Sequence, residues 1–156
     1  YYGNSNHGHK ALKYITALEP LSLLDVGCGH NAFVQEIKKF GVEKAIGVDF
    51  ACKSADKIAD ILDLPFDNKE FDLITAWDVL EHLLPDQIDP ALLEMQRVSE
   101  RFAFTIAYEY ASTPPPKKFS NHNLHQTVKE PEWWKEQIGK YAEVTKQNEI
   151  WLGKWK

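Results

Sequence analysis

The sequence predicts a doubly wound α/β fold with a mostly parallel sheet. Apolar segments of strand length alternate with helical segments along most of the 156 residues, and this alternation is typical of a parallel sheet that has helices on both faces. The run at residues 102–107 is apolar without polar alternation, which indicates a strand that is buried on both sides. Two short strand-like segments close the chain and predict an antiparallel hairpin.

The first half of the chain contains two strands and two helices. A helix is expected at residues 8–19 and a strand at 21–26. A second helix at 31–40 is followed by Gly41, a residue suited to a helix C-terminus, and a strand at 44–49 comes next.

The second crossover is unusually short. Asp60 follows Asp49 by only 11 positions, too few for a full helix and a strand. We therefore expect this crossover to lack its helix. The fourth strand is expected at residues 71–76, a helix near 89–100, and the fifth strand at 102–107.

A long loop is expected at residues 109–129, with Pro114-Pro115-Pro116 inside it. Loops of this length within a compact domain are usually functional. Pro131 is suited to the first turn of a helix, which we expect to reach about Gly139. The closing hairpin is then formed by residues 141–146 and 150–155.

Composition excludes several classes of protein. Residues 1–156 suffice for a single domain but not for a nucleotide domain with a separate substrate domain, which counts against a complete dehydrogenase. The net charge of −5 disfavours broad electrostatic binding to nucleic acid.

No apolar run near 18 residues and no basic leader occur, so we expect no membrane span and no secretory signal. Cys28 and Cys52 form no spaced ligand set and indicate reduced thiols in a cytoplasmic protein.

A glycine turn, Gly27-Cys28-Gly29, follows the first strand, and Asp49 closes the second. Glycine lets the backbone approach a ligand closely, and the helix that follows directs its free N–H groups there. An acid at the neighbouring strand end can bind two vicinal hydroxyls. Together these residues predict a nucleoside pocket.

Two cofactors fit such a pocket. The spacing Gly27-x-Gly29-x-x-Ala32, with Asp49 downstream, also fits the dinucleotide fingerprint. However, Asp25 lies two residues before the first glycine, where an anion would repel a pyrophosphate and would suit a cofactor with a cationic amino group. A nicotinamide-dependent oxidoreductase remains an alternative that depends on the glycine spacing alone.

The segment from Asp25 to Gly29 resembles motif I of the class I S-adenosylmethionine-dependent methyltransferases. The third glycine of that motif is Asn31 here, and asparagine tolerates a left-handed backbone. Residues 59–74 and 78–83 are similar to later segments of the same family, in the same order. The resemblance implies a seven-stranded, Rossmann-like sheet and S-adenosyl-L-methionine as the cofactor.

The resemblance also implies roles for individual residues. Asp49 is expected on the ribose hydroxyls, Asp60 on the adenine amino group, the Ile61 N–H on the adenine ring, and Gly27 with Asp25 near the methionine moiety. The full set of expected cofactor contacts is Asp25, Gly27, Cys28, Gly29, Asp49, Phe50, Asp60, Ile61 and Trp77.

Candidate residues on the acceptor side follow the fourth and fifth strands, where ligands of open parallel sheets bind. The candidate catalytic residues are His82, Tyr108 and, in the long loop, His125. An imidazole titrates near neutrality, so His82 can deprotonate an acceptor hydroxyl; local packing is the simpler interpretation. His125 can act as a base or close over the substrate, or it can simply face solvent.

No metal is expected from the sequence. His122 and His125 have a spacing that binds a metal only if a helical turn forms. No cysteine or acid of matching spacing accompanies them, whereas zinc sites use three or four protein ligands.

The predicted function is methyl transfer to an acceptor on a small molecule or saccharide. Trp77-Asp78-Val79-Leu80 differs from the Asn/Asp-Pro-Pro-aromatic motif of DNA amino-methyltransferases, so no nucleic-acid partner is favoured. The short stretch at residues 124–134 resembles methyltransferases of sugar and glycan pathways. A module that binds the cofactor or a partner without turnover is the alternative from another class, and the oligomeric state stays open.

Overall fold

The structure is a computed structural model that describes residues 7–111 and 123–156. Pro114-Pro115-Pro116 and His122, which belong to the expected functional loop, lie outside the described residues.

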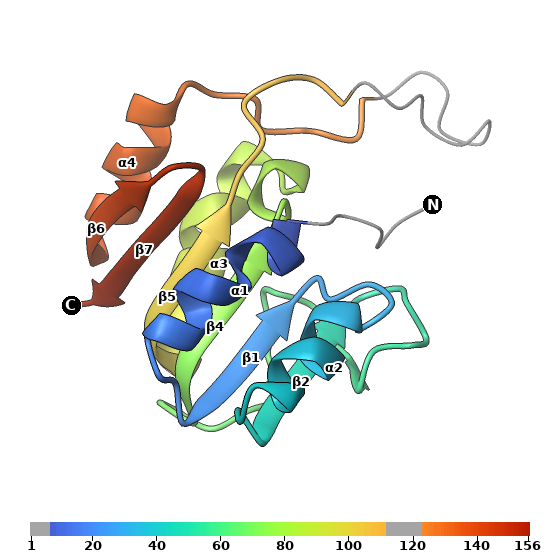
Figure 1. Cartoon of the computed structure of the whole chain (residues 1–156). Helices are drawn as coiled ribbons and strands as arrows, with labels where there is room; N and C mark the ends of the chain where they lie inside the picture. The colour runs from blue at the N-terminus through green and yellow to red at the C-terminus, as the bar shows by residue number, and fades with distance from the viewer. Residues whose placement is uncertain (1–6, 112–122) are drawn as a thin grey trace.

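The described chain forms one seven-stranded sheet in the order β3-β2-β1-β4-β5-β7-β6 (Figure 1). The strands are β1 (Ser22–Val26), β2 (Lys44–Asp49), β3 (Lys57–Ile58), β4 (Phe71–Trp77), β5 (Ser99–Thr105), β6 (Ala142–Gln147) and β7 (Ile150–Trp155). The first five strands run parallel, and β7 pairs antiparallel with both β5 and β6. The mostly parallel sheet with a C-terminal antiparallel hairpin is confirmed.

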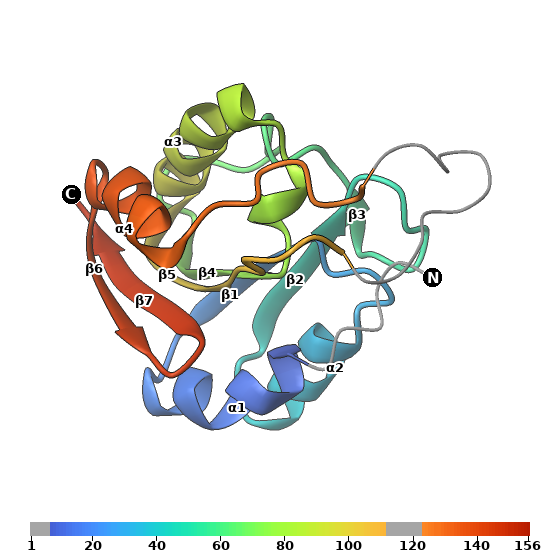
Figure 2. The ribbon, with the colours of Figure 1, turned by 90° about the horizontal axis from the view of Figure 1, so that it is seen from above.

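Helices cover both faces of this sheet. They are α1 (His7–Ala17), α2 (Ala32–Lys39), α3 (Ile88–Val98) and α4 (Pro131–Gly139), with short 3-10 helices η1 (Leu80–His82) and η2 (Pro85–Gln87). Figure 2 shows α1 and α2 on one side of the sheet and α3 and α4 on the other. The fold is therefore doubly wound.

Each face has its own hydrophobic core because successive strand residues point to opposite sides. Leu23 packs with Ile15 and Phe33 in the core under α1 and α2, whereas its neighbour Leu24 packs with Leu92 in the core under α3. All five of these residues are at most 8% exposed.

The second crossover lacks a helix, as expected. The described chain passes from β2 to β3 through turns and bends alone, and β3 is only two residues long. Both residues of β3, which forms this edge of the sheet, are exposed.

The boundary between α3 and β5 differs from the sequence-based prediction. The helix ends at Val98 rather than near residue 100, and the strand spans Ser99–Thr105 rather than residues 102–107. Ser99 is fully buried and its hydroxyl donates to the Met95 carbonyl, while Arg101 is paired with Asp72 at 2.8 Å. The strand thus begins with polar residues whose partners lie inside the protein. Because these residues are polar, the sequence does not indicate that the strand begins there.

Among the residues that the structure describes, no helix combines the length and the hydropathy that crossing a membrane would require.

Candidate active site

The turn between β1 and α2 holds three residues in the left-handed region. The φ angles are 70° at Gly27, 53° at Gly29 and 63° at Asn31. Glycine adopts these angles without steric cost and asparagine tolerates them, so Asn31 can take the place of the family's third glycine. A Cβ atom on Gly27 would lie 2.5 Å from Val79 Cγ2, so the turn also packs closely on the segment that follows β4.

Asp49, at the end of β2, holds this turn in place. Its Oδ2 accepts the Gly29 N–H at 3.0 Å, and its Oδ1 accepts the N–H groups of Ala51 and Cys52 at 2.9 and 2.8 Å. A carboxylate offers about four acceptor positions, and the protein occupies three of them. Binding of two ribose hydroxyls therefore requires Asp49 to exchange at least one backbone partner.

Asp25 lies beneath the turn rather than on its surface. It is 1% exposed, and its Oδ1 accepts the Thr75 hydroxyl at 2.6 Å. The pKa of Asp25 is raised to about 7, mainly by burial and to a smaller extent by the nearby Asp49 carboxylate, while the hydrogen bond from Thr75 opposes the increase. The structure therefore places the Asp25 carboxyl behind the glycine turn, in contact with Thr75.

The expected adenine contacts lie along the chain after β2. Phe50 is 77% exposed, and Asp60 is an exposed residue whose Oδ1 accepts the Leu62 N–H at 3.0 Å. Ile61 is 7% exposed and packs in the core, so its backbone rather than its side chain is suited to an adenine ring.

Trp77 and Cys28 occupy different environments. Trp77 is 7% exposed and packs edge-on against Phe33, with ring centroids 5.2 Å apart. The structure thus places Trp77 in the core under α1 and α2, not on an open surface. Cys28 is half-buried, burial raises the pKa of its thiol, and both Cys28 and Cys52 are free thiols, as expected.

The glycine turn and the acids at the ends of β2 and β3 fit an adenosyl nucleoside. Gly27 and Gly29 have no side chain to block close approach, and Asp49 and Asp60 offer carboxylates at adjacent positions of the sheet edge. The carboxylates can accept hydrogen bonds from ribose hydroxyls and from the adenine amino group. No cationic group that would bind a pyrophosphate is among the contacts described.

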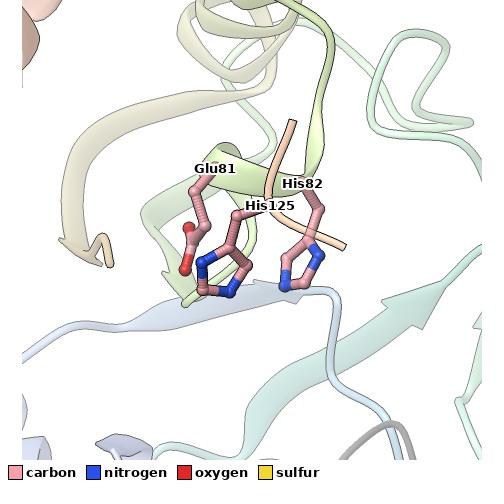
Figure 3. Close-up of side chains that lie close together, drawn as sticks. All are labelled: Glu81, His82 and His125. Carbon is pink, nitrogen blue, oxygen red and sulfur yellow. The ribbon is translucent and has the colours of Figure 1, made fainter. Parts of the chain in front are cut away.

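A second group of polar side chains lies next to the segment that follows β5. Glu81 and His82 belong to η1, and His125 comes from the chain just after the undescribed residues (Figure 3). The ring centroids of His82 and His125 are 4.9 Å apart. Each of the three residues places a ligand atom within 4.8 Å of those of the other two.

Burial governs the charges in this group. The pKa of Glu81 is raised to about 8, mainly by burial and also by the Asp78 carboxylate, while the hydrogen bond from the Ala107 N–H opposes the increase. Burial also lowers the pKa of His82, as does the nearby His125. The environment therefore disfavours the charged forms of both Glu81 and His82.

Tyr108 lies on a separate surface with Trp151 and Lys146. The Trp151 indole N–H donates to the Tyr108 hydroxyl at 2.8 Å, and the Lys146 ammonium lies 4.8 Å from the centre of the Tyr108 ring. Tyr108 also lines a cavity of about 520 Å³ between α1, the end of β5 and the β6–β7 turn. Lys10, Lys13, Tyr14, Asp78 and Glu109 also line this cavity.

The sequence did not identify Glu81 as a site residue. It indicated His125 as a possible metal ligand only together with His122. The structure instead brings His125 to the adjacent pair Glu81-His82, far away in the sequence. The available signal was an acid and a histidine side by side just after a buried strand. Their approach to His125 depends on the path of a long loop, which no local pattern describes.

Comparisons with known proteins identify the family. Residues 8–103 match the methyltransferase-domain family, and the chain belongs to it. The chain is an S-adenosylmethionine-dependent methyltransferase of class I, and S-adenosyl-L-methionine is its cofactor. A search of curated proteins found no significant match.

Solved structures share the fold at low sequence identity. The PH0226 protein of Pyrococcus horikoshii is 17% identical, with a TM-score of 0.72 over 99% of this chain and 95% of that one. A methyltransferase of Archaeoglobus fulgidus that depends on S-adenosylmethionine is 19% identical, with a TM-score of 0.67 over 89% of this chain and 69% of that one. The small RNA methyltransferase HEN1 is 20% identical, with a TM-score of 0.67 over 97% of this chain and 25% of that one. The oxidoreductase alternative finds no support in the family match, which covers the glycine turn itself.

Proposed function

We propose that the enzyme methylates a hydroxyl group of a small molecule or saccharide that binds in the cavity beside β5. The volume of about 520 Å³ carries this proposal, because small-molecule sites usually measure about 300–1,000 Å³. Tyr14 and Tyr108 provide aromatic faces, and Lys13 and Glu109 provide charged groups that suit several hydroxyls. A sugar presents the same combination of an apolar ring face and a polar rim.

The cofactor, when bound, supplies a methyl group on a sulfonium that is ready for in-line displacement. Positioning the acceptor can contribute roughly 7–11 kcal/mol, whereas a general base is worth about 10²- to 10⁴-fold. The main task of the chain is therefore to hold the acceptor in line. We place Tyr108 in the wall of the acceptor cavity. His82 and His125 lie beside residues 107–109 of that wall, and we propose them as bases for an acceptor hydroxyl that extends toward them.

We also propose which residues contact the cofactor. The glycine turn, Asp49 and the Phe50 side chain are proposed to hold the ribose and adenine, with Asp60 and the Ile61 backbone at the far side of the ring. The burial of Asp25 and Trp77 supports an indirect role for both. The proposed direct contacts are Gly27, Cys28, Gly29, Asp49, Phe50, Asp60 and Ile61.

Nucleic acid is the competing class of acceptor. HEN1 acts on small RNA and shares this fold, but the net charge of −5 opposes binding to a polyanion. The cavity also has the size of a small-molecule site, whereas surfaces that bind a nucleic-acid strand are open, basic grooves.

Transfer of a radiolabelled methyl group to a panel of acceptors tests the proposal. The panel contains mono- and oligosaccharides, small hydroxylated aromatic compounds and short RNA. We expect labelling of a saccharide or small hydroxylated compound, with a raised KM in Lys13→Ala and an unchanged KM in Lys39→Ala, a matched helical lysine outside the cavity. Label on RNA alone, or equal KM values in both variants, would refute it.

A further inference from the structure

The cluster of Glu81, His82 and His125 has the composition of a metal site. Two imidazoles and one carboxylate lie with their ligand atoms within 4.8 Å of one another. Two donors on one zinc-sized ion lie at most about 4.2 Å apart, twice a bond of about 2.1 Å. Closing around an ion therefore requires side-chain movements of roughly an ångström.

The backbone fixes which nitrogen of each ring is available. His82 Nδ1 lies 3.0 Å from the Leu124 carbonyl oxygen, and His125 Nδ1 lies 2.5 Å from the Glu109 carbonyl oxygen. A carbonyl only accepts, so each Nδ1 carries the proton and each neutral ring has its lone pair on Nε2. Metal-binding histidines are oriented in this same way, with the second nitrogen donating to a carbonyl.

Glu81 supplies the third ligand and the negative charge. It is fully buried, and its Oε1 accepts the Ala107 N–H at 3.1 Å. Its Oε2 is buried and has no hydrogen-bond partner among the described residues. An unpaired buried carboxylate oxygen is costly unless a donor or a cation meets it.

The Glu81 carboxylate and the two imidazoles each offer a ligand atom within 4.8 Å of the others, and Figure 3 shows the His125 ring between the other two side chains. The Glu81 Oε2 meets no hydrogen-bond donor among the described residues. We propose that Glu81, His82 and His125 bind a divalent first-row transition-metal ion at the acceptor side of the active site. Two imidazoles with one carboxylate are the ligands of catalytic zinc and of the facial triad of non-haem iron, whereas magnesium prefers oxygen ligands alone.

The three ligands do not line the acceptor cavity themselves, but they lie beside residues 107–109, which do. The Ala107 N–H and the Glu109 carbonyl, which contact Glu81 and His125, belong to the segment that lines the cavity. Three protein ligands leave coordination positions open for oxygens of a hydroxylated acceptor. An ion there lowers the pKa of a bound hydroxyl and orients it, so the hydroxyl loses its proton to solvent or to a nearby base before its oxygen takes the methyl group. This role in catalysis rests on the proposed function, whereas metal binding does not.

Titration of the full chain with Co²⁺, Mn²⁺ and Zn²⁺ tests the site without cofactor or acceptor. We expect one ion per chain, with visible absorption of bound Co²⁺, and much weaker binding of Mg²⁺. His125→Ala and Glu81→Gln should each weaken binding by at least about 10- to 100-fold, the loss that removal of an outer partner alone can cause. His9→Gln is the matched control, because His9 is exposed and contacts Glu36 on another face.

Circular dichroism shows whether a variant that binds the ion weakly is still folded. If His125→Ala does not fold, Glu81→Gln still tests the site, because glutamine has nearly the same shape as glutamate. Absence of stoichiometric binding by all three ions would overturn the inference, as would equal affinity in wild type and in both folded ligand variants. In that case the Oε2 atom carries a proton instead.

The acceptor panel, repeated with a chelator and with added Mn²⁺, distinguishes this inference from the proposed function. Binding of the ion without methylation of any small hydroxylated compound supports the site and refutes the proposed acceptor. Methylation that a chelator leaves unchanged supports the acceptor and refutes the ion's catalytic role.

Discussion

At the scale of single residues, Asp49 has two tasks that the sequence suggests only in part. The carboxylate was expected to bind ribose, and in the structure it also accepts three backbone N–H groups of the turns that surround the pocket. One side chain therefore shapes the pocket and is proposed to contact the ligand.

Asp49→Ala tests this double role. We expect S-adenosylhomocysteine to bind more weakly by roughly 1.5–3 kcal/mol, the value of a hydrogen bond to a charged group. We also expect a lower free energy of unfolding, because the turn loses its acceptor. Fluorescence titration and urea denaturation measure the two effects, and Asp67→Ala, an exposed acid away from the turn, serves as the control. Unchanged affinity would remove Asp49 from the cofactor site.

Asp25 predicts a specific pH dependence of stability. Its pKa in the folded chain is about 7, compared with 3.8 for an unperturbed aspartate. The folded state therefore holds a proton that the unfolded state releases, so this contribution to stability is complete below pH 3.8 and is lost as the pH rises through about 7.

In Asp25→Asn this titration is absent, while the amide oxygen can still accept the Thr75 hydroxyl. The free energy of unfolding of the variant, relative to wild type, should rise between pH 5 and pH 7 by up to about 1.4 kcal/mol per pH unit. Urea denaturation at a series of pH values measures it. A difference that stays constant over this range would contradict the raised pKa.

At the scale of elements, the β6–β7 hairpin depends on a close contact at Gly153. A Cβ atom there would lie 2.3 Å from the Glu143 carbonyl oxygen and 2.4 Å from Phe102 Cζ. Only a residue without a side chain allows β7 to pack this closely between β6 and the Phe102 ring.

Gly153→Ala should therefore destabilise the protein by about 1–3 kcal/mol, the usual cost of overpacking. Gly139→Ala is the matched control, since a Cβ atom at the end of α4 meets nothing within 4 Å. Thermal unfolding of the two variants provides the comparison. Equal stability of the two would show that the hairpin adjusts freely.

The elements also show where sequence patterns succeed and fail. The strands β1 and β4 are predictable from apolar runs that are buried on both faces, and β2 from an apolar run of strand length. The short crossover before Asp60 follows from chain length alone. The start of β5 was missed because Ser99 and Arg101 are polar and find partners only in the folded chain.

At the scale of the whole molecule, the carboxyl ends of the parallel strands bring distant residues to one edge of the sheet. The turn after β1, Asp49 at the end of β2 and η1 after β4 lie at this edge, and the motif order therefore predicts a cofactor site there. The contact between His125 and Glu81-His82 could not be predicted, because these residues are distant in the sequence and share no motif. The depth of Asp25 was missed because an acid in a motif carries no sign of its burial.

Calorimetric titration of the wild-type chain with S-adenosylhomocysteine and, separately, with NAD tests the central claim most directly. We predict saturable 1:1 binding of S-adenosylhomocysteine and no measurable heat from NAD. Binding of NAD without binding of S-adenosylhomocysteine would contradict the assignment of the glycine turn to the methyl-donor cofactor.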